Sequence, residues 1–320
     1  MADTTVTTPR RRFRLDPSLI IVIALLAVVV GAGFVLSDRF GTTRNFTNVL
    51  EQMAALGFAS LGQALVVIVG GIDLSIGAVV TASTVLMASV VEIHPALMIP
   101  MIFVTLLFGA AIGFLNGFIT IRTGVHPLIV TLGTASILNG VVLIFTLQPT
   151  GSVPFWFEEF AYGRIAGLPI SGLVMLACFG LVWVFLRYTE TGRAFYAVGG
   201  SPEAARLTGI RSDRIILMAY SASGFFAAMA GAYFVSRTGV GDPRVGDPIT
   251  LASITPVILG GLLLGGGKGN IFGVLLGVFL ISLLSNLLNY MNVSTFIQWV
   301  IQGLIIIIAV SIYVNKGKKL

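Results

Sequence analysis

Residues 18–36 read SLIIVIALLAVVVGAGFVL, a stretch in which no side chain carries a charge. A helix of about 20 apolar residues crosses about 30 Å of hydrocarbon, the thickness of a bilayer core. The apolar residues also follow one another directly, whereas the strands of a membrane β-barrel alternate apolar and polar residues. The stretch therefore predicts a transmembrane α-helix.

The composition of the whole chain agrees with a protein that lies mostly in lipid. Of its 320 residues, 56% are hydrophobic and 10% are charged, against about 25% charged residues in soluble globular proteins. Intrinsic disorder is excluded, since it requires low hydrophobicity and high charge. A disulfide-rich scaffold is excluded because Cys178 is the only cysteine.

The same pattern of apolar runs predicts ten membrane-spanning segments and therefore an all-α polytopic membrane protein. The segments are residues 18–36, 52–70, 74–91, 95–118, 127–147, 168–187, 214–235, 250–264, 270–290 and 295–314. They form a single transmembrane domain at 18–314, preceded by a basic segment at 1–17 and followed by a tail at 315–320.

The arginines at positions 10–14 resemble the start of a signal peptide. However, the apolar stretch that follows is long enough to span, and Ser37-Asp38-Arg39 is a poor cleavage site. We therefore expect the first helix to be retained.

The basic residues predict the orientation of the chain. Alternating the ten segments across the membrane places fourteen of the 19 Lys and Arg residues on one side, and such an excess marks the cytoplasmic side. Both termini are then cytoplasmic, and the net charge of +6 needs no nucleic-acid partner to explain it. The cytoplasmic segments are 1–17, 71–73, 119–126, 188–213, 265–269 and 315–320.

Two stretches outside the membrane are long enough to have a function of their own. The external stretch 148–167 is rich in aromatic residues, which form either a belt at the membrane interface or a docking surface or gate. In the cytoplasmic stretch 188–213, Gly199-Gly200 predicts a break, and Ser201 and Pro202 suit the N-cap and first position of a helix.

The predicted cytoplasmic helix covers about 202–208. Glu203 in its first turn complements the helix dipole, and Gly209 suits its end. A helix this short is not stable alone in water. It must pack against the membrane helices or against a separate protein.

Four blocks of this sequence, in order and at matching spacing along about 45–312, resemble the sugar-type permeases of ABC importers. These permeases include the ribose, galactose, xylose and autoinducer permeases, in a superfamily that also holds branched-chain amino-acid permeases. The blocks are Gly70-Gly71-Ile72-Asp73-Leu74-Ser75-Ile76-Gly77; Pro127-Leu128-Ile129-Val130-Thr131-Leu132-Gly133-Thr134; Thr191-Gly192-Arg193 through Gly209-Ile210; and Gly260-Gly261 with Gly265-Gly266-Gly267-Lys268-Gly269.

The resemblance implies the transmembrane permease subunit of a type II ABC importer in a bacterial inner membrane, moving a sugar or sugar-like solute inward. It implies a dimeric permease core, two cytoplasmic ATPase subunits that bind ATP and Mg, and an extracytoplasmic solute-binding protein. The short cytoplasmic helix would be the coupling helix seated in a groove of the ATPase. Its coupling residues would be Ser201, Pro202, Glu203, Ala204, Ala205, Arg206, Leu207 and Gly209. A bulky charged residue at Ala205 would then uncouple ATP hydrolysis from transport in a folded permease.

The chain has no recognisable motor of its own. A phosphate-binding loop needs Gly, four residues, then Gly-Lys-Ser/Thr, but Leu262 and Gly269 stand where that pattern needs Gly and Ser or Thr. We therefore expect no bound cofactor in this chain, with ATP hydrolysis by a partner. An ion-coupled secondary transporter, or a channel for a small polar solute, is the alternative.

Asp73 is the charged residue closest to membrane depth. It is either an N-cap at the cytoplasmic start of the third span, accepting from amides near Ser75, or a buried functional carboxylate. With Asp73, the candidates for the solute pathway are Ser75, Asn116, Thr131 and Asn139. Their alternative role is to hold helices together by hydrogen bonds.

The sequence gives no sign of a catalytic or metal site. His94 and His126 stand alone, without partners at metal-binding spacing. In the eighth span, Thr250-Leu251-Ala252-Ser253-Ile254 replaces a Glu-Leu-Asp-x-Ile pattern that many members of the family carry. The partner of this permease is therefore either a second copy or a paralogous permease, and the sequence leaves the identity of the solute open.

Overall fold

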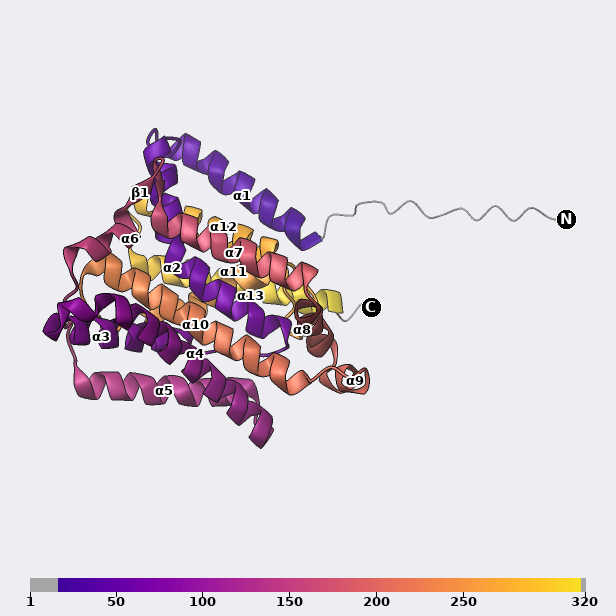
Figure 1. The fold of residues 1–320 in the computed structure, drawn as a ribbon. Coiled ribbons are helices and arrows are strands. Elements are labelled where there is room, and N and C mark those ends of the chain that lie inside the picture. The colour runs from indigo at the N-terminus through magenta and orange to yellow at the C-terminus, as the bar shows by residue number, and fades with distance from the viewer. Residues whose placement is uncertain (1–16, 318–320) are drawn as a thin grey trace, which may run out of the picture.

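The computed structural model describes residues 17–317 as a bundle of helices that run between its two ends at different tilts (Figure 1). The long helices are α1 (Pro17–Leu36), α2 (Thr43–Ile68), α3 (Ile76–Ile93), α4 (Met98–Thr123), α5 (Pro127–Phe145), α7 (Ile170–Tyr188), α10 (Ser212–Thr238), α11 (Asp247–Leu259), α12 (Ile271–Tyr290) and α13 (Thr295–Gly317). The short elements are η1 (Pro95–Leu97), η2 (Phe155–Glu158), α6 (Glu159–Tyr162), β1 (Arg164–Ile165), β2 (Leu168–Pro169), α8 (Glu190–Gly200) and α9 (Pro202–Leu207).

Each of the ten predicted segments coincides with a helix, which confirms the all-α polytopic fold. Within residues 17–317, eight helices are long and apolar enough to cross a membrane. The largest difference in boundary is at α2, which begins at Thr43 instead of 52 because the Thr42 hydroxyl accepts a bond of 3.2 Å from the Asn45 amide. An N-cap of this kind fixes the start of a helix.

The eighth predicted span, 250–264, is wrong as a full crossing. Helix α11 has 13 residues, about 20 Å at 1.5 Å per residue, which is too short for the hydrocarbon core. It ends at Leu259 because the glycines that follow turn the chain, with Gly261 at φ +87°.

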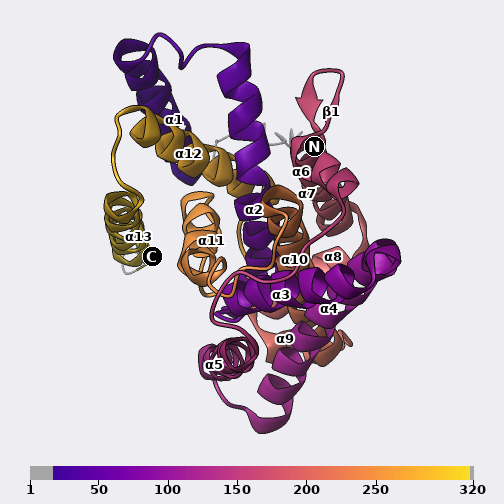
Figure 2. The ribbon, with the colours of Figure 1, turned by 90° about the vertical axis from the view of Figure 1, so that its left-hand side faces the viewer.

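Helix α10 is the centre of the bundle and packs against α2, α3 and α4. The contact with α4 is close because both helices present glycine: a Cβ at Gly109 would overlap the carbonyl oxygen of Gly224, and one at Gly113 that of Tyr220. The spacing of small residues on α4 therefore marks close helix packing, as it commonly does in membranes. Figure 2 shows α3, α4 and α10 together, with α5 on one side and α11 and α13 on another.

The two ends of the bundle agree with the predicted alternation. The turn after α4, the α8–α9 segment and the start of α1 all lie at one end, opposite α6 and β1 (Figure 1). Most of the basic segment 1–17, and residues 318–320 of the predicted tail, lie outside the described residues. The exception to the alternation is 71–73, which does not lie at that end of the bundle, as shown below.

Candidate functional site

The connection between α2 and α3 re-enters the bundle. Helix α2 ends where Gly70 takes φ +87° and the amides of Gly70 and Gly71 donate to the carbonyls of Val67 and Val66. Only glycine adopts such a conformation without strain. A Cβ at Gly71 would overlap the hydroxyl of Tyr220, on the central helix α10. The chain therefore turns inward, and residues 71–73 are not the cytoplasmic loop that the sequence predicts.

Asp73 is buried at the end of this connection, with 1% of its surface exposed. Its Oδ1 accepts from the Ser75 amide at 2.9 Å and from Ser75 Oγ at 2.6 Å, and its Oδ2 accepts from Ser223 Oγ at 2.7 Å. Ser223 lies about 17 Å along α10 from its first residue and about 23 Å from its last, at 1.5 Å per residue. Asp73 therefore lies inside the bundle.

This geometry corrects one part of the prediction for Asp73 and confirms another. The bond from the Ser75 amide is the one expected of a cap, although the N-cap residue of α3 is Ser75 itself. The carboxylate does not stand at the cytoplasmic start of a span, because α3 begins only after the chain has already re-entered the bundle. A buried carboxylate must be hydrogen-bonded to be tolerated, and three hydroxyl and amide groups meet that need.

Three of the other predicted pathway residues join the same network. Asn116 on α4 donates to Ser75 Oγ at 2.9 Å and accepts from Thr134 Oγ1 of α5 at 2.6 Å. Thr131 of α5 accepts from the Leu74 amide at 3.1 Å. The network thus joins the re-entrant segment to α4, α5 and α10.

Asn139 is separate from this network among the described residues: it is half-buried, two turns beyond Thr131 on α5. Ser75, Asn116 and Thr131 are fully buried. Their geometry is that of groups that hold helices together, and a role in the solute pathway stays a prediction for all of these residues.

A second re-entrant segment leads into α11. After α10 ends, Gly241 pairs with Thr150, Thr84 Oγ1 donates to the Asp242 carbonyl at 3.2 Å, and the Gly246 amide donates to Thr81 Oγ1 at 3.0 Å. The segment therefore runs along α3 from Thr84 to Thr81, towards the first turn of that helix. The predicted span boundaries leave the Gly-Asp-Pro turns at 241–243 and 246–248 in an external loop. In the structure both turns belong to the segment that descends along α3.

The first turns of α3 and α11 meet within the bundle. A Cβ at Gly77 would overlap the carbonyl of Gly246, and one at Gly246 would overlap that of Gly77. Along the axis of α10, residues 77–81 lie between Ser223, which bonds to Asp73, and Gly231, which lies against Val80 and Ser83. Both helix N-termini, with their partial positive charge, therefore lie near the middle of α10. The sequence analysis did not predict this contact. The only indication of it in the sequence was the repeated Gly-Asp-Pro turn at 241–243 and 246–248.

Glycines from three segments meet at the end of α8, and we call Gly70, Gly199, Gly266 and Gly267 the glycine junction. The Gly267 amide donates to the Ile68 carbonyl at 2.9 Å. A Cβ at Gly199 would overlap that carbonyl and the Gly267 amide, and one at Gly266 would overlap the backbone of Gly70. The sequence predicts a break at Gly199 and Gly200. In the structure these two residues are instead the last residues of α8.

The helix ends that enter this junction are alike. At Gly261, as at Gly70, φ is +87°, and the amides of Gly261 and Leu262 donate to the carbonyls of Ile258 and Val257. This is the arrangement seen at Gly70 and Gly71. The Gly70-Gly71 and Gly260-Gly261 blocks therefore mark two equivalent helix ends, in which Gly70 corresponds to Gly261.

Helix α9 has the predicted caps. Ser201 Oγ accepts from the Ala204 amide at 3.2 Å, Pro202 begins the helix, and Gly209 follows it at φ +87°. Ser212 Oγ donates to the Pro202 carbonyl at 2.8 Å, and Arg206 forms an ion pair with Asp213, so that α9 is held against the start of α10.

The predicted coupling residues do not share one face of α9. Glu203, Ala204 and Arg206 are exposed and Leu207 is 90% exposed, whereas Ala205 is 4% exposed and packs into the core of the bundle. The side chain of Ala205 is therefore not exposed for contact in this structure, because its methyl group packs against the protein's own helices. A charged residue there would act on the fold first. A role of the α9 residues in contacting an ATPase stays a prediction.

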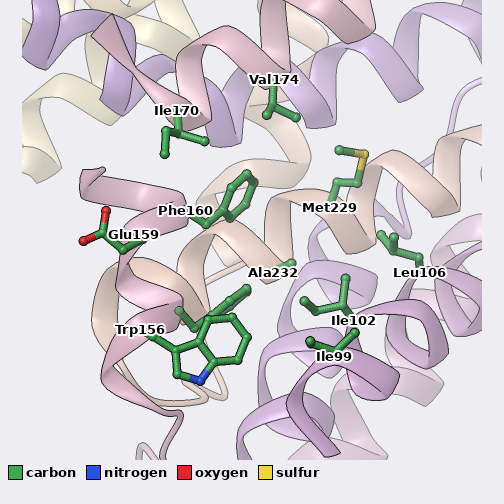
Figure 3. Close-up of a pocket in the computed structure, with 11 residues that line it drawn as sticks. Ile99, Ile102, Leu106, Trp156, Glu159, Phe160, Ile170, Val174, Met229 and Ala232 are labelled. Carbon is green, nitrogen blue, oxygen red and sulfur yellow. The ribbon is translucent and has the colours of Figure 1, made fainter. Parts of the chain in front are cut away.

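The aromatic stretch at 148–167 lines an open cavity of about 460 Å³ together with α4, α7 and α10 (Figure 3). Phe160 and Met229 line its inner part, Ile99 and Ile102 of α4 lie opposite, and Trp156 stands at its edge. Phe157 is buried and packs against Phe160, whereas Phe155 and Trp156 are exposed. The stretch therefore contributes to packing as well as to the surface.

Among residues 17–317, no group of three or more His, Cys, Asp and Glu side chains could hold a metal ion. Two re-entrant segments inside a bundle of spanning helices, with an exposed helix at one end, define the class: an α-helical membrane permease. The chain matches the family model described as "Branched-chain amino acid transport system / permease component" over residues 45–310, and it belongs to that family.

Named relatives align with nearly the whole chain. The ribose import permease protein of Bacillus subtilis is 36% identical over 291 residues, covering 89% of this chain and 88% of the relative. The ribose import permease protein of Escherichia coli K12 is 34% identical, covering 92% and 91%. The fructose import permease protein of Rhizobium meliloti is 32% identical, covering 93% and 85%. No solved structure matches the chain.

Proposed function

We propose that this chain is the membrane subunit of an ATP-driven importer that moves a sugar or sugar-like solute into the cytoplasm. The observation that supports it best is α9, a capped helix with Leu207 exposed, which follows directly after the end of α8 at the glycine junction. An apolar side chain exposed in this way on a short helix suits a groove of another protein. The printed names of the relatives supply the class of solute.

The proposed partners follow from that role. Cytoplasmic ATPase subunits bind ATP and Mg and contact α9, while an extracytoplasmic binding protein delivers the solute to the opposite end of the bundle. A second copy of the chain, or a paralogous permease, completes the pathway. This chain itself carries no cofactor and catalyses no reaction, and its two termini face the cytoplasm of a bacterial cell.

The geometry offers a route by which ATPase movement reaches the membrane. The glycine junction places the end of α8 directly on the last turn of α2 and on the loop after α11. These are the cytoplasmic ends of the two structures that re-enter the bundle. A displacement of α9 is therefore transmitted to both without an intervening flexible side chain.

The test is uptake in liposomes by the chain together with the ATPase and the binding protein of its importer. We expect accumulation of a tested sugar, among ribose, fructose and allose, to require ATP inside the liposomes and to persist with a proton and sodium ionophore. The permease alone should accumulate none. Accumulation that the ionophore abolishes, or that the permease alone performs, would identify an ion-coupled transporter instead.

A further inference from the structure

A cavity of about 260 Å³ lies between α11 and α13, two helices that stand side by side in Figure 2. Its lining includes Asp247, Leu251 and Thr255 of α11 and Trp299 and Gln302 of α13. The first of these residues starts α11 directly after Gly246, which contacts Gly77 near the middle of the bundle. The cavity therefore begins at mid-membrane depth and continues along α11.

The charged residues beside the cavity argue against contact with lipid here. Asp247 and Arg244 are exposed on the molecular surface, at a depth where a charged side chain in contact with lipid is costly. Irregular backbone at membrane depth, such as residues 239–246, is tolerated only where it is buried in protein or lines an aqueous cavity. We infer that the cavity faces a water-filled path.

One buried group in the lining lacks a partner. Thr255 is 1% exposed, and its Oγ1 forms no hydrogen bond within the described residues. A buried hydroxyl without a partner costs about 1–3 kcal/mol. Thr255 lines the cavity, but its Oγ1 is itself covered, so a solute hydroxyl placed there would supply the bond after a rotation of the Thr255 side chain.

The other polar groups suit the same kind of ligand. Gln302 Nε2 donates to Ser285 Oγ at 3.4 Å, and among the described residues this leaves one N–H and the carbonyl oxygen of the amide. Trp299 adds a broad apolar ring with an N–H at one edge, and Asp247 adds acceptors. Hydroxyl groups on one side and C–H groups on the other are the surface that a sugar ring presents.

We propose that this cavity holds the sugar in transit, with Thr255, Gln302 and Asp247 as its hydrogen-bonding groups and Trp299 stacked on the ring. The proposal rests on the proposed transport of a sugar and names the residues that contact it. Such contacts must be few, because a solute that binds tightly in a conduit does not leave it. A mostly apolar cavity with a few converging polar groups meets that condition.

Tryptophan fluorescence tests directly whether the sugar contacts Trp299. The chain has 3 tryptophans, so the W156F/W183F variant keeps Trp299 alone. In this variant, assembled with its ATPase in lipid nanodiscs, we expect millimolar D-ribose, D-fructose or D-allose to change the Trp299 emission in a saturable way. The Trp299 emission is obtained by subtracting the emission of the W156F/W183F/W299F assembly, which keeps any tryptophans of the ATPase and of the nanodisc scaffold. Thr255→Val should weaken that response about threefold to tenfold, the effect of one hydrogen bond.

Transport by the complete importer gives the second measurement. Thr255→Val should lower the maximal uptake rate by about the same factor. Its matched control is Thr105→Val, which removes another buried Thr hydroxyl that has no partner but lies on α4 and outside the cavity. Trp299→Phe should lower uptake, whereas Trp183→Phe should not.

The two proposals fail in different ways. If the wild-type importer accumulates a sugar while Trp299 emission is unresponsive to it, and Thr255→Val transports as Thr105→Val does, this site is wrong and the proposed function stands. If the wild-type importer accumulates none of the sugars, the proposed function fails. Sugar-dependent Trp299 emission that Thr255→Val weakens more than Thr105→Val supports the site.

Discussion

Ser223 Oγ donates a hydrogen bond of 2.7 Å to Asp73 Oδ2 across 150 residues of sequence. This bond fixes the re-entrant segment before α3 to the central helix α10. Since Asp73 is buried, each of its oxygens needs a donor, and Ser223 is the donor to Oδ2. The position of the first re-entrant segment therefore depends on α10.

We expect Ser223→Ala to lower the free energy of unfolding by about 1–3 kcal/mol, because it leaves a buried carboxylate oxygen without its donor. Ser221→Ala, two residues away on the same helix, is the control. Cys178 is the only cysteine and is half-buried, so its reaction with a thiol-specific dye during heating in detergent reports unfolding. Equal melting curves for the two variants would contradict the prediction.

The glycine junction predicts a contrast between two adjacent residues. Gly199→Ala places a methyl group against the Ile68 carbonyl and the Gly267 amide, whereas a Cβ at Gly200 meets nothing within 4 Å. We expect Gly199→Ala to lower the number of solute molecules imported per ATP hydrolysed, and Gly200→Ala to leave it unchanged. The ratio of uptake to phosphate release measures this, since simple loss of folded importer lowers both together.

Amide hydrogen exchange in the wild-type importer provides an independent check of the junction. The amides at 199–200 and 265–269 should change their exchange rates together when ATP binds, because Gly267 and Gly199 both contact the end of α2. A change at α9 alone, with 265–269 unaffected, would show that movement does not pass through the junction.

Helix α9 predicts opposite effects at two alanines. Ala204→Glu adds a charge on the exposed face and should weaken binding of the ATPase while the permease melts normally. Ala205→Glu buries a charge in the core and should lower the melting temperature, since an unpaired buried charge is strongly destabilising. Co-purification of the ATPase and the thiol-dye melting curve separate the two. If Ala205→Glu melts normally, Ala205 does not pack as the structure shows.

The contact between the two re-entrant segments should be intolerant of added bulk. Gly246→Ala and Gly77→Ala each force a methyl group into the other segment's backbone, and overpacking of this kind costs about 1–3 kcal/mol. Gly133→Ala on α5 meets nothing within 4 Å and should be neutral. The thiol-dye melting curve measures all three, and normal melting of both Gly246→Ala and Gly77→Ala would contradict the contact.

Much of the architecture was predictable because lipid restricts the choices of a chain so strongly. Backbone groups in hydrocarbon must bond within the protein, so a long apolar stretch is a helix. The caps of α9 were equally local, since Ser201, Pro202 and Gly209 act on amides and carbonyls a few residues away. The burial of Ala205 was not predictable because the sequence does not show which side of so short a helix faces the bundle.

The sequence by itself determined that the chain lies in the membrane, which segments are helical, where helix α9 begins and ends, and which family the protein belongs to. The tertiary structure alone decided that 71–73 and 239–246 re-enter the bundle, that Asp73 bonds to Ser223, and that three glycine segments meet. The physical reason is range. Caps and apolar runs act between near neighbours, whereas the depth of a segment and the partner of a buried group depend on helices far away in sequence that pack around them.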